Sequence, residues 1–158
     1  MKILVASTFS SATDAGGGRA VANLARALRT QAHSVEELSL PFDPDPEWII
    51  EQMLAISLTD VSNAGELLIA LRAPAHLLPH PNKVVWFQRH EVEVSDRILR
   101  KSVNSADRAA LGQARRVFST STDAAEHLRR DLGIDTEVLH RPLQPGAVWD
   151  DAVARLLG

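Results

Sequence analysis

A series of short apolar runs, separated by longer amphipathic stretches, constrains the fold more than any other feature of this sequence. Six segments have the length of strands, and they occupy residues 2–7, 34–40, 67–71, 83–87, 116–119 and 136–139. Apolar residues at consecutive positions are typical of strands that are buried on both faces, as in a parallel sheet covered by helices. The pattern therefore predicts parallel β-structure with long connections between the strands.

The connections carry the signals of helices. Four helices are expected to begin near Arg19, Pro46, Val94 and Asp123. The first carries Leu24 and Leu28 at a helical spacing, and the fourth is expected to be capped by Thr122 or Asp123 and to end at Gly133. Strands that alternate with helices in this way predict a single α/β domain: a Rossmann-like, doubly wound parallel sheet in three layers, α/β/α.

Composition excludes several classes of protein. The 158 residues contain 17 Lys and Arg against 20 Asp and Glu, a net charge of -3, so a nucleic-acid partner is not expected. No apolar run approaches the roughly 18 to 20 residues of a membrane span, and the apolar start is too short for a signal peptide, so a cytoplasmic location is expected. The absence of cysteine excludes thiol catalysis and cysteine-ligated zinc.

A metal site and a metal cofactor are not expected. His76 and His80 have the spacing of a helical metal pair, but Pro79 and Pro81 disfavour a continuous helix there. The two histidines are therefore expected to have separate roles.

The glycine-rich stretch before the first helix is a candidate phosphate-binding loop. Gly16, Gly17 and Gly18 precede the helix, and Arg19 adds a charge at its start, where free N–H groups and the helix dipole favour anions. A flexible turn without a ligand is the alternative. Val21 occupies the third position of a dinucleotide-binding pattern, which requires a small residue, and the Gly-Lys-Ser/Thr of a P-loop is absent.

Several segments together resemble glycosyltransferase family 4. Residues 16–28, 32–35, 80–86 and 114–121 are similar to segments of the acceptor-side, N-terminal domain of its two-domain GT-B fold, in the same order, and the resemblance covers nearly residues 1–143. It implies transfer of a sugar from a nucleotide-sugar to a glycosyl acceptor across a cleft between two domains, usually without a required metal. A chain of this length has room for one of those domains, and the donor-binding half is not in it.

The last thirteen residues form a separate amphipathic segment. Residues 146–158 carry Trp149 and Val153 on one stripe and resemble the family's final helix, which crosses back from the donor half to the acceptor half. We expect a domain at residues 1–145 with this helix packed on it. Loss of the donor domain between about His140 and Trp149 is one interpretation, and a helix native to the domain is the other.

Three further residues are candidates at the carboxyl edge of the sheet, where open α/β sheets bind ligands. By the resemblance, His90 is a catalytic or acceptor-orienting histidine, although the preceding Gln88 and Arg89 depart from the family's His-Gln-His-Arg-like string. Arg72 and Arg89 are candidate acceptor-binding residues. Ordinary surface positions are the alternative for each of the three.

On these grounds we expect the acceptor-side half of a family 4-like glycosyltransferase, inactive alone. A partner chain that supplies the donor domain, or self-association, would follow from the surface left bare by a missing domain. A stand-alone Rossmann-like nucleotide-binding module and an engineered single-domain scaffold without catalysis are the alternatives, because fold alone does not separate them.

Overall fold

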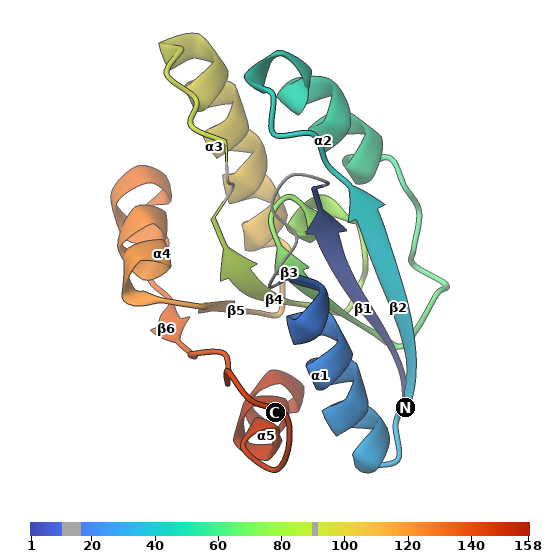
Figure 1. The fold of residues 1–158 in the computed structure, drawn as a ribbon. Helices are drawn as coiled ribbons and strands as arrows, with labels where there is room; N and C mark the ends of the chain where they lie inside the picture. Colours follow the sequence, from blue (N-terminus) through green and yellow to red (C-terminus); the bar gives the residue numbers. More distant parts are fainter. Residues whose placement is uncertain (11–16, 90–91) are drawn as a thin grey trace.

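The computed structural model of the chain describes residues 1–10, 17–89 and 92–158. These residues form one sheet of six parallel strands in the order β2-β1-β3-β4-β5-β6 (Figure 1). The strands are β1 (Lys2–Phe9), β2 (Ser34–Pro41), β3 (Leu67–Arg72), β4 (Lys83–Gln88), β5 (Arg116–Ser119) and β6 (Glu137–Val138). The predicted α/β class with a Rossmann-like parallel sheet is confirmed.

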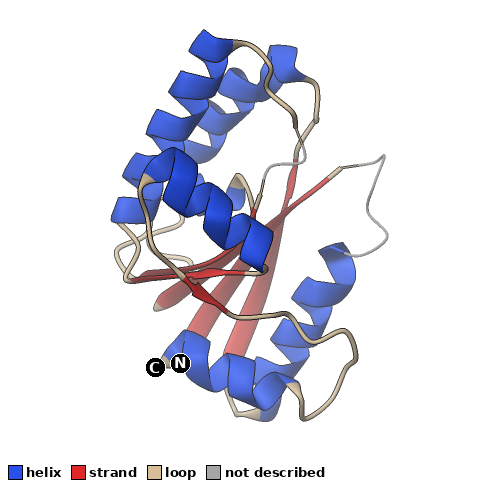
Figure 2. Ribbon diagram, turned by 90° about the vertical axis from the view of Figure 1, so that its left-hand side faces the viewer, coloured by secondary structure: helices blue, strands red, loops and turns tan. Residues whose placement is uncertain are grey.

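Helices cover both faces of this sheet (Figures 1 and 2). They are α1 (Gly17–Thr30), α2 (Ile49–Ser57), α3 (Arg97–Gly112), α4 (Thr122–His127) and α5 (Trp149–Leu157), with short 3-10 turns η1 (Pro46–Trp48) and η2 (Ala75–Leu77) and a π-helical turn η3 (Leu128–Leu132). None of the helices in the described part of the chain is long and apolar enough to cross a membrane.

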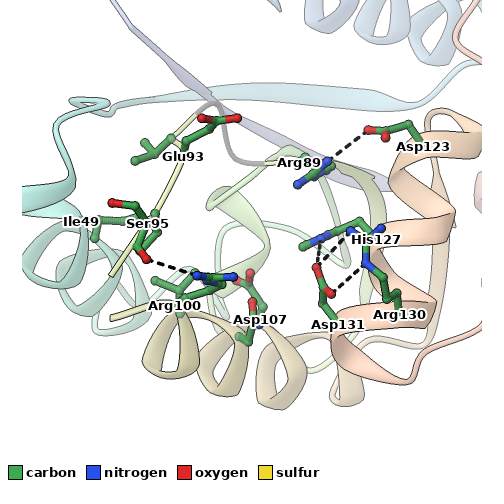
Figure 3. Close-up of a pocket in the computed structure, with 14 residues that line it drawn as sticks. Ile49, Arg89, Glu93, Ser95, Arg100, Asp107, Asp123, His127, Arg130 and Asp131 are labelled. Carbon is green, nitrogen blue, oxygen red and sulfur yellow. Dashed lines mark hydrogen bonds and ion pairs between the residues drawn. The ribbon is translucent and has the colours of Figure 1, made fainter. Parts of the chain in front are cut away.

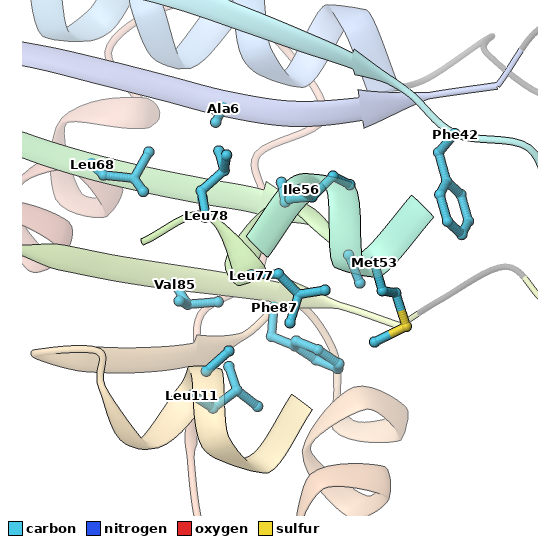
Figure 4. Close-up of a cluster of buried hydrophobic side chains, with 14 of the residues drawn as sticks. Ala6, Phe42, Met53, Ile56, Leu68, Leu77, Leu78, Val85, Phe87 and Leu111 are labelled. Carbon is cyan, nitrogen blue, oxygen red and sulfur yellow. The ribbon is translucent and has the colours of Figure 1, made fainter. Parts of the chain in front are cut away.

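The alternation of side chains along each strand produces two apolar layers. On β3, Leu68 and Ala70 pack toward α2, α3 and α4, as Figure 4 shows for Leu68 with its neighbours. Leu67, Ile69 and Leu71 point to the opposite face, which α1 and α5 cover. A strand between two helical layers needs apolar residues at every position, and this requirement explains the continuous apolar runs in the sequence.

Chain topology explains why the sheet needs α5. Parallel crossovers are almost always right-handed, so the step from β1 to β2 places α1 on one face, and the later steps in the opposite direction place α2, α3 and α4 on the other. The face of β4 and β5 that shares the α1 layer would otherwise be bare. Trp149, Val153 and Leu156 of α5 are buried there, and they complete the three-layer structure.

The start of α4 differs from the prediction by one residue. Ser121 is the N-cap rather than Thr122 or Asp123, since its Oγ accepts a hydrogen bond from the N–H of Ala124 at 3.1 Å. Ser121 has the extended backbone that an N-cap requires, whereas the next residue is already helical. Gly133, with a φ of 69°, ends η3 as predicted.

Two other elements, α3 and β6, are shorter than expected. The predicted helix over residues 94–114 begins only at Arg97, because the carboxylate of Asp96 caps it by accepting from the N–H of Leu99 at 2.7 Å. The last strand consists of Glu137 and Val138 alone, at the edge of the sheet. Both differences lie at element ends, where local sequence signals are weakest.

Candidate functional site

The carboxyl edge of the parallel sheet gathers most of the residues predicted for the site. Gly17, Gly18 and Arg19 form the first turn of α1, Arg72 is the last residue of β3, and Arg89 follows β4. Two predicted residues, Gly16 and His90, lie outside the described residues. The side chain of Arg72 is buried, whereas those of Arg19 and Arg89 reach the surface.

Two arginines lie close together at this edge. Arg141, which follows β6, is partly buried and donates from Nη2 to Oε1 of Gln88 at the end of β4. Burial lowers the pKa of Arg141, and the positive charge of Arg72 lowers this pKa further. Thr8, at the end of β1, donates from Oγ1 to the carbonyl oxygens of Arg72 and Ala73 at 3.4 and 3.0 Å.

Together these contacts connect the ends of β1, β3 and β4 with the segment after β6. Arg72 and Arg141 thus bring two positive charges to this edge. Helix α1 is the next element after β1 along the chain, and the first turn of a helix favours anions. Arg141 was not predicted as a site residue, although it lies two positions after a predicted strand and so belongs at the same edge of the sheet. Its neighbour Gln88 is 53 positions earlier in the chain, so no local pattern pairs the two.

Arg89 has a different environment from Arg72. Its Nη1 lies 3.3 Å from Oδ2 of Asp123 at the start of α4, on the face that α2, α3 and α4 cover. Arg89 therefore borders a separate pocket. The two predicted acceptor-binding residues share the carboxyl edge without sharing one site.

This pocket lies between the segment that follows β4, helix α3, and helix α4 with its π-helical extension (Figure 3). Its volume is about 690 Å³, which is in the range of small-molecule sites. Its lining residues combine apolar and charged side chains: Ile49, Arg89, Val92, Glu93, Val94, Ser95, Arg100, Val103, Asn104, Asp107, Asp123, His127, Arg130 and Asp131. Most of them were not singled out in the sequence.

His127 is a polar group of the pocket wall that is held by two contacts. Its Nδ1 lies 2.8 Å from Oδ2 of Asp131, and its ring stacks on Phe87 with an interplanar angle of 11°. Desolvation lowers the pKa of His127, and the nearby Arg89 lowers it further, against the opposing effect of Asp131. The pKa of Asp131 is itself lowered, chiefly by its hydrogen bond with Arg130. At neutral pH the pair is therefore a neutral imidazole beside a carboxylate.

A second histidine–aspartate pair lies deeper, beneath the pocket. Nε2 of His76 and Oδ1 of Asp107 are 2.7 Å apart, and both side chains are buried. The ring of His76 also meets Phe87 edge-on, at 5.4 Å between centroids. Asp107 thus connects the buried pair to the pocket that it borders.

The histidines expected to have separate roles do have separate partners. His80 contacts the carbonyl oxygens of Asn82 and Gly65, at 2.8 and 3.1 Å, whereas His76 faces Asp107. Among the described residues, no group of three or more His, Asp or Glu side chains is placed to hold a metal ion.

Two comparisons of this chain, with protein-family models and with curated proteins, found no match. The class of the chain therefore follows from its architecture: a Rossmann-like α/β domain with a positively charged carboxyl edge and an adjacent pocket.

Proposed function

We propose that this chain is the acceptor-side half of a family 4-like glycosyltransferase, whose reaction transfers a sugar from a nucleotide-sugar to a glycosyl acceptor. The carboxyl edge supports this proposal most directly. Arg72 and Arg141 are both at this edge, where the charge of Arg72 lowers the pKa of Arg141, and Arg19 is in the first turn of α1, the helix that follows β1. The leaving group of such a reaction is a nucleoside diphosphate, and guanidinium groups with a helix N-terminus are suited to its charge.

By itself the chain should be a poor catalyst. Stabilisation of a departing diphosphate requires donors placed around it in a site that excludes water. The strand ends of one domain supply only one side of such a site. In this proposal a second domain, on a partner chain, supplies the other side and the donor-binding residues.

The final helix does not favour either interpretation of its origin. It resembles the returning helix of the family, yet its burial against the sheet meets a need that any domain of this topology has. The proposal therefore depends on the charged edge and on the order of the resembling segments rather than on α5.

An exposed apolar stripe on α2 favours a partner. Ile50 and Leu54 of α2 and Leu58 directly after it recur every four residues and are exposed, Leu54 to 57% and Leu58 to 74%. Contiguous apolar surface of this kind often marks a contact with another protein. A stand-alone nucleotide-binding module would use the same charged carboxyl edge, but it would not require an exposed apolar stripe on α2. A scaffold without a ligand would not require the charged edge.

Calorimetric titration with UDP, GDP, their common sugar conjugates and NAD tests the proposal. We expect a nucleoside diphosphate to bind, and Arg19→Ala and Arg141→Gln to weaken the binding. Arg26→Ala is the matched control, since Arg26 is an exposed arginine two turns further along α1. Selective binding of NAD, or equal losses with Arg26→Ala, would contradict the proposal.

A further inference from the structure

The hydrogen bond to Asp131 determines which ring nitrogen of His127 carries the proton. A carboxylate only accepts hydrogen bonds, so Nδ1 of the neutral imidazole is protonated and Nε2 keeps its lone pair. Within the described residues no hydrogen bond reaches Nε2, and Nε2 is not one of the fully buried polar atoms without a partner. The pocket wall thus presents a fixed hydrogen-bond acceptor that is accessible to a ligand.

The surroundings hold the ring in this orientation. Stacking on the buried Phe87 fixes its plane, and only 11% of the His127 side chain is exposed. Asp131 is held in turn by Arg130, whose Nε lies 3.1 Å from Oδ1 of the carboxylate. An imidazole oriented by a carboxylate in this way is the arrangement that proteins use to accept a proton or a hydrogen bond from a hydroxyl group.

The charges that border the pocket largely compensate one another. Arg89 pairs with Asp123, Arg130 pairs with Asp131, and Asp107 faces the buried His76. A ligand in the pocket is therefore surrounded by both hydrogen-bond donors and hydrogen-bond acceptors, and not by charges of a single sign. Such a lining suits a neutral molecule with many hydroxyl groups, and the apolar side chains of Val92 and Val103 suit its C–H faces.

The geometry points to a binding site, separate from the charged edge, in which Nε2 of His127 accepts a hydrogen bond from a hydroxyl of a neutral sugar or cyclitol. In a glycosyltransferase half this ligand would be the acceptor, and only that assignment rests on the proposed function. The binding itself uses residues of this chain alone.

Affinity in this site should depend on pH. Protonation would change Nε2 from a hydrogen-bond acceptor into a donor. Binding of the ligand should therefore weaken as the pH falls through the lowered pKa of His127. The other charged groups that face the ring are Arg89, Asp131 and Asp107, with Arg130 behind Asp131. The pKa of Asp131 is lowered as well, chiefly by its hydrogen bond with Arg130, and this favours the ionised carboxylate that holds the ring.

The test is an NMR titration of the whole chain with myo-inositol, glucose and mannose. At least one probe should cause saturable shifts at the amides of α3 and α4 that border the pocket. His127→Phe keeps the stacked ring but lacks Nε2, and it should weaken binding roughly tenfold, as expected for a lost hydrogen bond between polar groups. The matched control is His140→Gln, which replaces an exposed histidine outside the pocket and should bind as the unmodified chain does.

Three results would each overturn the inference. They are the absence of saturable shifts with every probe, equal affinity in His127→Phe, and a ring spectrum of the unmodified chain in which Nε2 carries the proton. The ring spectrum requires no variant, so it tests the inference even if His127→Phe does not fold. Nucleotide titration reports on the charged edge and sugar titration on the pocket, so failure of this inference is distinguishable from failure of the proposed function.

Discussion

The indole of Trp149 lies edge-on against the indole of Trp86, with ring centroids 6.0 Å apart and an interplanar angle of 77°. Trp86 is in β4, at the centre of the sheet, and Trp149 begins the last helix. Both indole N–H groups donate to carbonyl oxygens, Trp86 to Leu139 at 2.6 Å and Trp149 to Gln144 at 2.9 Å. This pair joins the end of the chain to the core, and it makes α5 an integral part of the domain.

Trp149→Ala should therefore destabilise the domain strongly. Removal of a fully buried indole leaves a cavity against Trp86 and costs about 3–5 kcal/mol of unfolding free energy. Urea unfolding followed by circular dichroism measures the loss. Deletion of residues 146–158 should have at least as large an effect.

The control for this substitution is Val148→Ala, because Val148 is adjacent but exposed. It should change the unfolding free energy by less than about 0.5 kcal/mol. An unchanged melting temperature after the deletion would show that α5 is not docked on the sheet.

Stability should rise with pH above neutrality because of Lys83. This side chain is buried, its Nζ donates to the carbonyl oxygens of His76 and Leu78 at 2.7 and 3.2 Å, and burial lowers its pKa to about 8. In the unfolded chain a lysine has a pKa near 10.4. Between about pH 8 and pH 10.4 the unfolded state thus binds more protons, so the unfolding free energy increases with pH, by up to about 3 kcal/mol.

Denaturant unfolding at several pH values from 7 to 10 measures this slope. The chain contains no tyrosine or cysteine and has only two other lysines, so few other groups titrate in this interval. Lys83→Met should abolish the rise, and the exposed Lys101→Met should retain it. A flat profile in the unmodified chain would contradict the prediction.

The buried pair of His76 and Asp107 should be sensitive to loss of one partner. Asp107→Ala leaves the imidazole of His76 without the carboxylate 2.7 Å away and should lower the unfolding free energy by about 3 kcal/mol. Asp107→Asn retains a hydrogen-bonding group of the same shape and should cost clearly less. Chemical denaturation of both variants at pH 7 provides the comparison, and equal losses would mean that packing rather than the polar contact sets the cost.

The apolar stripe on α2 should promote self-association when no partner is present. We expect the mass from light scattering to increase with protein concentration, because Leu54 and Leu58 expose apolar surface that association would cover. Leu54→Glu with Leu58→Glu should restore a monomer. Replacement of two exposed residues of α3, Lys101→Glu with Ser105→Glu, is the control for added charge. A monomer at all concentrations in the unmodified chain would argue against the stripe as a contact surface.

Much of the fold was accessible from the sequence because its signals are local. The consecutive apolar residues of β3 and β4, the helical spacing of Leu24 and Leu28, and the stop at Gly133 each reflect the chemistry of a few adjacent residues. The positions of Arg72 and Arg89 at the carboxyl edge followed from the same reasoning, since parallel strands all end at one edge. The roles of these residues in binding remain predictions.

The pocket was not accessible in this way. His127 and Asp131 are four residues apart on α4 and its extension, but what gives them a role is the stacking of His127 on Phe87 and the approach of Arg89, both from another element. The pairing of Arg141 with Gln88 is likewise a contact between distant segments. Apart from the polarity of these side chains, nothing in the sequence indicates that they lie together in the folded chain.

The sequence by itself determined the strands, the helices and the edge at which charged residues would collect, because hydrophobic periodicity and turn chemistry act over a few residues. Tertiary structure alone decided that Arg72 would lie beside Arg141, that α5 would cover the bare face of the sheet, and that His127 would face a pocket as a neutral imidazole. These features depend on which elements are brought together by packing. Burial and the charges of distant neighbours, which exist only in the folded chain, then set the chemistry of each group.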